Sequence, residues 1–432
     1  MTRPMMSETQ TQTQAPSHRA FLRAFGKIGL LSFGGPAAQI AVMQRVLIDE
    51  RGWIGERDFL AALSFCMLLP GPEAMQLATW LGWRLRGTWG GVVAGLLFVL
   101  PGALVVLLLA ALYWHVGAVP VVSALFIGVK ATVIAIVLSA LIKLSRRTLS
   151  NTALWSVAAV TFVAMFAFAV PFPLIILLAA LAGLAMPKDP EMSVVPSSAT
   201  TSLRDSLSTA IRWLAIWWVP LLLLYFWNPD GVLWDIGRFF SWLAVLSFGG
   251  AYAVLSWLAQ DAVGQFGWLT TAQMMDGLGL AETTPGPLIL VTEFVGFLAG
   301  AQEGGWGFGV IAALVTLWAT FVPCFLWIFV GAPWLSWLCG QPRLAGMLRT
   351  ITASVVGVMA SLALWFALHT LFVDVQPYQA GLVKVLVPEL TTLHGRALVL
   401  TCFALWLVFY LGWGTLRVLA VSCLVAGLFA VL

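Results

Sequence analysis

Long stretches of apolar residues, separated by short polar segments, dominate the pattern along this chain. A helix that crosses a bilayer needs about 20 consecutive apolar residues, and stretches of that length recur throughout the sequence. They predict an all-α polytopic membrane protein with about thirteen transmembrane segments. The predicted spans are residues 25–48, 58–83, 88–114 and 118–142, two short spans within 152–186, then 209–229, 234–260, 270–300, 305–331, 346–373, 397–411 and 414–431.

Two polar segments divide this apolar pattern. Residues 1–20 are polar and lack the apolar core of a signal peptide, so we interpret them as a disordered cytoplasmic tail. Residues 187–208 are rich in Ser, Thr, Pro and charge, which is typical of a linker. We therefore expect a first membrane repeat at 21–186, a cytoplasmic linker at 187–208 and a second membrane repeat at 209–432.

The composition places this chain in lipid. It is 61% hydrophobic and 9% charged, whereas a soluble protein carries about 25% charged residues. The net charge of +4 comes from basic residues in short loops, as is usual for cytoplasmic loops, and does not indicate a nucleic-acid partner. The five cysteines form no CxxC pair, and the chain has no metalloprotease, hydrolase or nucleotide-binding motif. We expect no enzyme activity, no metal and no cofactor.

The two halves carry the same motifs in the same register. Ser32-Phe33-Gly34-Gly35 recurs 215 positions later as Ser247-Phe248-Gly249-Gly250, and Pro70-Gly71-Pro72 recurs at the same distance as Pro285-Gly286-Pro287. Duplicated motifs that interrupt apolar segments are typical of transporters whose site lies between two repeats.

The basic residues of the loops indicate how the repeats are oriented. In the first half, Arg84 and Arg86 follow the Pro-Gly-Pro span and residues 143–147 supply three more basic residues, while the loop between has no fixed charge. In the second half only the middle loop is basic, through Arg343 and the nearby Arg349. Because basic residues collect in cytoplasmic loops, we predict inverted repeats with a cytoplasmic N-terminus.

Each Pro-Gly-Pro motif is predicted to end one half-helix and begin another. Proline removes a backbone donor and clashes with the preceding turn, and in hydrocarbon such a break survives only where protein or a water-filled cavity satisfies the freed groups. The new helix N-terminus offers free N–H groups and a positive dipole end, which favours an anion. The alternative is a plain proline kink.

Other groups near the breaks are secondary candidates. The glycine pairs serve close packing or ligand contact, and the Ser32 and Ser247 hydroxyls bond either an oxyanion or, more simply, their own helix. Lys130 lies about halfway along an apolar span, where it either faces the anion or pairs with a carboxylate such as Glu73 or Glu293. Arg84 and Arg86 are interpreted mainly as residues that fix the membrane topology. The alternative is that they line an entry vestibule through which the substrate reaches the site. The substrate-binding candidates are Ser32, Gly34, Gly35, Pro36, Gln39, Pro70, Gly71, Pro72, Glu73, Lys130, Ser247, Gly249, Gly250, Thr283, Thr284, Pro285, Gly286 and Pro287, and the coupling or access candidates are Glu73, Arg84, Arg86, Glu282 and Glu293.

These motifs resemble the chromate transporter (CHR) family in its long, two-domain form. The resemblance covers about residues 25–145 and 235–370, through blocks such as LSFGGPAAQIAVM and LLPGPEAMQLATWLGW in the first half and LSFGGAYAVL and DGLGLAETTPGPLIL in the second. Two positions depart from the family pattern. Ala251 replaces the proline expected by analogy with Pro36, and Gln39 stands where many relatives have histidine, which argues against a titrating imidazole there.

The resemblance implies a carrier in the bacterial inner membrane that expels chromate, driven by the proton motive force. Chromate is then the transported anion, protons are a candidate coupling ion, and the lipid bilayer is the surrounding solvent. A sulfate or other oxyanion permease, or an anion channel, on the same scaffold is the alternative, and a non-transporting membrane scaffold is a remoter one. The sequence leaves the oligomeric state open, a homodimer included.

Overall fold

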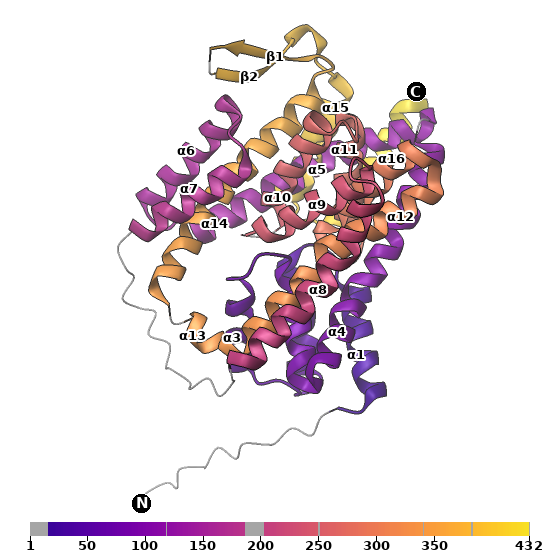
Figure 1. Ribbon diagram of the computed structural model, residues 1–432. Coiled ribbons are helices and arrows are strands. Elements are labelled where there is room, and N and C mark those ends of the chain that lie inside the picture. Colours follow the sequence, from indigo (N-terminus) through magenta and orange to yellow (C-terminus); the bar gives the residue numbers. More distant parts are fainter. Residues whose placement is uncertain are drawn as a thin grey trace, which may run out of the picture.

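The computed structural model describes residues 16–117, 119–185, 203–248, 251–339, 341–381 and 383–431. These residues form a bundle of α-helices with one two-stranded hairpin at its edge (Figure 1). Within the described ranges, five helical segments are long and apolar enough to cross a membrane, and four further apolar helices are shorter. The protein is therefore a polytopic membrane protein. The long segments are Glu73–Val116, Ala124–Thr148, Leu203–Trp227, Leu288–Trp334 and Pro342–Leu371.

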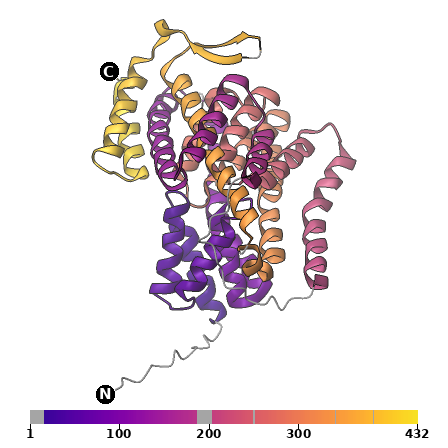
Figure 2. The same cartoon turned by 90° about the vertical axis from the view of Figure 1, so that its left-hand side faces the viewer.

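The first half begins with short helices and continues with long ones. Helix α8 (Leu203–Trp227) follows it and stands at the edge of the molecule, opposite the C-terminal helices (Figure 2), with only Trp217 and Leu221 buried among its residues. The elements of the first half are α1 (His18–Leu31), α2 (Pro36–Gln44), a π-helix (Arg45–Asp49), α3 (Glu56–Cys66), α4 (Glu73–Val116), α5 (Pro120–Thr148), α6 (Thr152–Phe168) and α7 (Phe172–Ala185).

The second half has the same order of helices, including a second π-helix at the matching place. It adds a short helix before α14 and a β-hairpin after it. The elements are α9 (Val232–Leu246), α10 (Ala251–Gln260), a π-helix (Asp261–Gln265), α11 (Thr271–Thr283), η3 (Leu288–Leu290), α12 (Val291–Gly331), η4 (Ala332–Trp334), α13 (Leu335–Cys339), α14 (Pro342–Leu371), β1 (Val375–Ala380), β2 (Val383–Pro388), η5 (Leu390–Thr392), α15 (Gly395–Phe409) and α16 (Thr415–Val431).

Helices α4 and α12 each consist of two arms folded against each other. The backbone leaves the helical region at Arg86 and Gly87 in α4, and at Gly304 and Gly305 in α12. Small residues line both folds: a Cβ at Gly82 would overlap Ala94, and a Cβ at Gly300 would overlap Ala312. Close approach through small residues is the usual way for membrane helices to pack.

The short C-terminal helix pair of each half packs against a long helix of the other half. Helices α6 and α7 cover α14, and α15 and α16 cover α5 (Figure 1). Both contacts depend on glycine, because a Cβ at Gly357 of α14 would overlap the Ala158 carbonyl of α6, and a Cβ at Gly128 of α5 lies too close to the Ser422 carbonyl of α16.

Several predicted boundaries differ from those of the structure. Helix α1 starts at His18, inside the predicted tail, because the Ser17 hydroxyl caps it by accepting the Ala20 N–H (3.3 Å). Helix α8 starts at Leu203, inside the predicted linker, whose residues 187–202 lie outside the described ranges. The run 152–186 does form two short helices, as predicted.

The predicted number of spans also differs. The segments 25–48, 58–83, 234–260 and 270–300 are each divided into shorter helices, so they are not continuous spanning helices. The β-hairpin at Val375–Pro388 is absent from the all-α prediction, because its six-residue strands lie between two apolar runs and pair only with each other.

Candidate functional site

The two Pro-Gly-Pro breaks are joined to the opposite halves of the protein by backbone hydrogen bonds. The N–H of Gly71 donates to the carbonyl of Ser247 (2.9 Å), and the N–H of Gly286 donates to the carbonyl of Ser32 (2.7 Å). Ser32 and Ser247 are the C-terminal caps of α1 and α9. Helix-terminal carbonyls lack a partner within their own helix, so each break satisfies a group that the other half leaves free.

Glycine is required at both breaks. Gly71 and Gly286 have φ of +122° and +89°, a region that side chains rarely adopt. A Cβ at Gly71 would also lie 2.7 Å from Nε2 of Gln76 and 3.0 Å from Sγ of Cys324. The backbone of α4 passes equally close to the second break, where a Cβ at Gly102 would overlap the carbonyl oxygen of Pro285.

Two fully buried amide side chains hold the break carbonyls. Gln39 of α2 donates from Nε2 to the Gly286 carbonyl (2.7 Å), and Gln76 of α4 donates from Nε2 to the Pro70 carbonyl (2.6 Å). Gln39 therefore joins the first half to the second break, a positioning role that an amide performs without titrating. The role of Gln76 was not predicted from the sequence. The signal that could have indicated it is a single amide side chain in an apolar helix.

A new helix begins after each break without a side-chain cap. Pro72 is the N-cap of α4 and Pro287 is the N-cap of η3, which continues into α12. Gly35, with φ of +84°, likewise precedes Pro36 at the start of α2. Gly34 has φ of +85°, whereas Gly249 and Gly250 lie outside the described residues. Uncapped N-termini keep N–H groups available for an anion.

The hydroxyls near the breaks bond their own helices. Ser32 donates to Ile28 (2.6 Å) and Ser247 to Ala244 (2.9 Å), the simpler of the two roles predicted for them. Thr283 and Thr284 donate to Leu280 (2.7 Å) and Ala281 (3.0 Å). In this arrangement the four hydroxyl protons are engaged, so an anion here would be bound through backbone N–H groups.

Three carboxylates lie near the breaks, in different surroundings. Glu73 is the first residue of α4 and is partly buried. Arg147 of α5 contacts the Met67 sulfur (3.6 Å), which places it beside the first break although the sequence indicated only a topology role. Glu293, in the first turn of α12, is 1% exposed, and its Oε2 has no hydrogen-bond partner in the described structure. Glu282 is buried in α11.

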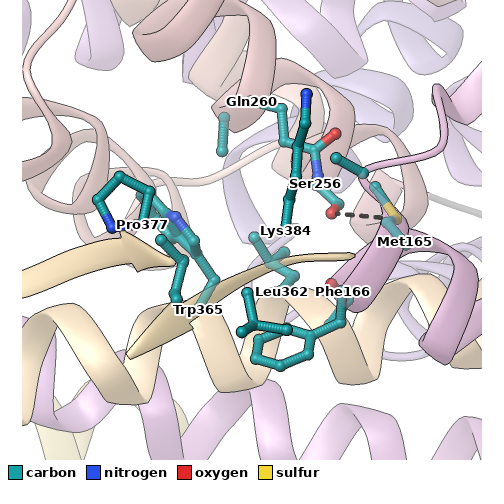
Figure 3. Close-up of a pocket in the computed structure, with 13 residues that line it drawn as sticks. Met165, Phe166, Ser256, Gln260, Leu362, Trp365, Pro377 and Lys384 are labelled. Carbon is teal, nitrogen blue, oxygen red and sulfur yellow. Dashed lines mark hydrogen bonds between the residues drawn. The ribbon is translucent and has the colours of Figure 1, made fainter. Parts of the chain in front are cut away.

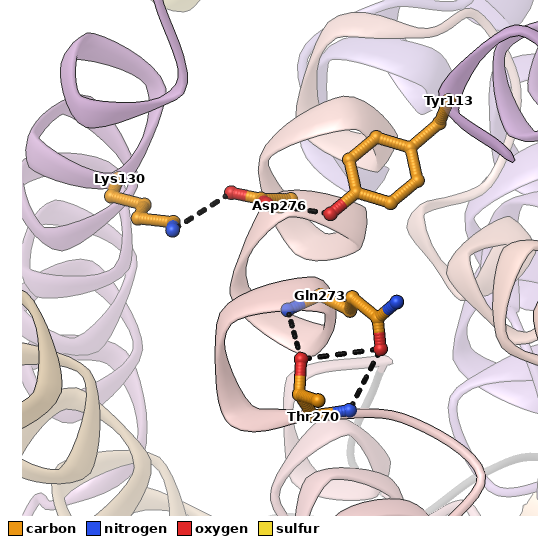
Figure 4. A network of polar contacts seen from close by, with 5 residues as sticks. All are labelled: Tyr113, Lys130, Thr270, Gln273 and Asp276. Atoms are coloured by element: carbon orange, nitrogen blue, oxygen red, sulfur yellow. Dashed lines mark hydrogen bonds and ion pairs between the residues drawn. The ribbon is translucent and has the colours of Figure 1, made fainter. Parts of the chain in front are cut away.

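Lys130 pairs with a carboxylate that the sequence analysis did not single out. Its Nζ lies 3.1 Å from Oδ1 of Asp276 on α11, and the Tyr113 hydroxyl donates to Oδ2 of the same carboxylate (2.8 Å) (Figure 4). The expected alternative partners, Glu73 and Glu293, form no ion pair with Lys130 in the described residues. The pairing alternative was thus right about the kind of contact and wrong about the residue.

Arg84 and Arg86 lie away from the breaks. Arg84 is exposed, and Arg86 donates to the Pro16 carbonyl and to Nε2 of His18 (2.6 Å) at the start of α1. These contacts fit the anchoring role better than the vestibule role.

A separate cavity of about 240 Å³ lies beneath the β-hairpin (Figure 3). Residues of α6, α10, α14 and the hairpin line it, among them Ser256, Gln260, Ser361 and Lys384. None of the break residues contributes to it.

Paired helix breaks inside an apolar helical bundle are typical of membrane transporters. The chain belongs to the chromate transporter family, whose model matches residues 19–184 and 234–430. It is thus a long member with two family segments. No solved structure matches this chain.

Relatives with known names cover most of this chain. A chromate transport protein from Pseudomonas aeruginosa is 33% identical over 83% of this chain and 84% of its own length. A probable chromate transport protein from Synechococcus elongatus is 29% identical over 86% of this chain and 90% of its own length. A chromate transport protein from Cupriavidus metallidurans is 29% identical over 86% and 88%.

The contact of Gly102 with the second break generates a stability prediction. Gly102→Ala should lower the free energy of unfolding by about 1–3 kcal/mol, because the new methyl group overpacks against the Pro285 carbonyl. Thermal unfolding of the purified protein in detergent measures this. Gly307→Ala, in α12 with open space around it, is the control and should not lower stability. Equal melting temperatures for Gly102→Ala and wild type would contradict the close contact.

Proposed function

We propose that this protein is a secondary transporter that exports chromate from the bacterial cytoplasm across the inner membrane, coupled to the proton motive force. The observation that carries the proposal is that each of the two breaks is hydrogen-bonded to a helix end of the other half of the chain. Relatives named chromate transport proteins support the choice of substrate.

The site that we propose lies between the breaks. Chromate is a tetrahedral divalent oxyanion, and the uncapped first turns after Pro72 and Pro287 offer N–H donors and positive dipole ends to it. The glycines and prolines of the two motifs shape this site, while Gln39 and Gln76 fix their carbonyls. Few buried cations are needed, which suits a membrane interior where isolated charges are expensive.

We further propose that the two repeats, 21–186 and 209–432, have opposite orientations in the membrane. The reversed pattern of basic loops supports this. So does the arrangement of the short helices, since α1 and α3 lie at one end of the molecule and α9, α10 and α11 toward the other (Figure 1). Helix α8 runs between the two ends and would supply the reversal.

Two carboxylates are our candidates for coupling near the breaks. Glu293 is fully buried and its Oε2 lacks a partner, so the neutral acid is the form that the site accommodates at least cost. Glu73 stands at the N-terminus of α4, where the helix dipole favours the carboxylate. A carboxyl group in either place can take up and release a proton as its surroundings change.

Cysteine labelling tests the inverted topology. In a background without native cysteines, cysteines at positions 86 and 303, near the folds of α4 and α12, should react with a membrane-impermeant reagent from opposite faces. Intact cells and inverted vesicles give the two accessibilities. Labelling of both positions from one face would rule the inversion out.

Substitution of the break glycines tests the site. Gly71→Leu or Gly286→Leu should lower transport by about tenfold or more, because the leucine is strained at positive φ and disturbs the backbone that offers the donors. Gly412→Leu is a matched control with φ of +64° and open space around it, in the turn before α16. Normal transport by either break variant at normal membrane levels would reduce the breaks to kinks.

Uptake of labelled chromate into inverted membrane vesicles tests the function itself. An exporter coupled to the proton motive force should accumulate chromate inside energised vesicles, and a protonophore should abolish the accumulation. Sulfate is added as competitor to measure selectivity. Equilibration without accumulation would indicate a channel, and preferred uptake of sulfate would indicate a sulfate permease.

A further inference from the structure

The network of Lys130, Asp276 and Tyr113 joins the two halves of the protein at a second place, away from the breaks. Lys130 and Tyr113 belong to α5 and α4 of the first half, whereas Asp276 belongs to α11 of the second (Figure 4). The side chains of Lys130 and Asp276 are 20% and 8% exposed. Oδ1 of the carboxylate forms an ion pair with the ammonium group without a hydrogen bond, and Oδ2 accepts a hydrogen bond from the phenol.

This network acts on the half-helix that leads into the second break. Asp276 precedes Thr283, the last residue of α11, by seven positions, or roughly 10 Å at the helical rise. Between them Gly279 packs so closely on Val129 of α5 that a Cβ would overlap that side chain. The Lys130–Asp276 pair therefore ties α11 to α5 about two turns from the break.

The charge of the network depends on one proton. While Asp276 is ionised, it neutralises Lys130, and the pair offers a dianion no net attraction. When Asp276 is protonated, Lys130 becomes an uncompensated cation about two helical turns from the break, and a buried charge without a partner attracts an ion of opposite sign. We propose that Asp276, rather than the two carboxylates near the breaks, carries the proton that is linked to chromate binding, and that its protonation releases Lys130 to bind the transported oxyanion.

Other titratable groups lie on α11 and on the elements around it. Helices α4, α5, α12 and α16 and the turn η3 pack against α11. In the described structure, Asp276 bonds only Lys130 and Tyr113. Other titratable groups of these elements include Glu282 on α11, His115 on α4, Glu293 on α12, and Arg417 and Cys423 on α16.

The proposal rests on the proposed function and specifies its coupling. One proton on Asp276 and one dianion on Lys130 bind together, so they cross the membrane in the same direction with a net charge of minus one. The membrane potential, negative inside, then drives this unit outward. The electrical part of the proton motive force drives this export, whereas the pH gradient opposes it, because the proton moves outward with the anion.

Chromate binding to the purified full-length protein in detergent tests the proposal. Wild-type affinity should fall by about tenfold for each pH unit above the titration of Asp276, and binding should take up one proton from a weakly buffered solution. Asp276→Asn should bind chromate with pH-independent affinity and without proton uptake. Lys130→Met should weaken binding by about tenfold to a hundredfold, because a charge-assisted hydrogen bond is lost.

Asp261→Asn is the matched control, since Asp261 is a carboxylate bonded to Trp257 (2.7 Å) outside the network, and it should keep wild-type proton uptake. Should Asp276→Asn not fold, Tyr113→Phe replaces it. Loss of the phenol donor makes Asp276 easier to protonate, so the midpoint of binding should move to higher pH.

Proton uptake by Asp276→Asn at the wild-type level, an unmoved midpoint in Tyr113→Phe, or full chromate affinity in Lys130→Met would overturn the proposal. Wild-type binding that is independent of pH would also overturn it and leave the proposed function standing. A wild-type protein that binds no chromate would instead contradict the proposed function.

Discussion

Two backbone hydrogen bonds between the halves hold the centre of this protein together. Each joins a helix-ending carbonyl, at Ser32 or Ser247, to a glycine N–H in the opposite Pro-Gly-Pro motif. A buried peptide group without a partner costs about 1–3 kcal/mol, so a broken helix in an apolar interior is stable only beside a complementary break. The glycines, the prolines and the close passage of Gly102 all follow from this mutual requirement.

The breaks could be predicted from the sequence because their backbone conformations restrict which residue types can occupy them. Only glycine and proline suit such positions, and their recurrence at one spacing identified both motifs together. The sequence did not predict Gln76, Arg147 or Asp276. Each is a single polar residue in or beside an apolar helix, and its role comes from a partner that the fold brings near. Lys130 is an example. Its position in the middle of an apolar span indicated that it has a partner, but the sequence did not indicate that the partner is Asp276.

The fold was predictable where apolar length determines it and not where the chain turns back. Hydropathy located the apolar segments and the helix pair within 152–186. Hydropathy predicted 25–48 and 58–83 as single spans. A stretch of apolar residues has the same composition whether it crosses the membrane as one helix or breaks and turns back within it. The strands at Val375–Pro388 lacked a signal of comparable length.

The short helix pair at the end of each half packs against a long helix of the other half, and this has a consequence for biosynthesis. Helix α5 is made early, but α15 and α16, which cover it, are made more than 200 residues later. Until then the face of α5 around Gly128 meets lipid or a chaperone instead of the Ser422 backbone. The first half therefore cannot reach its final packing until α15 and α16 have been synthesised.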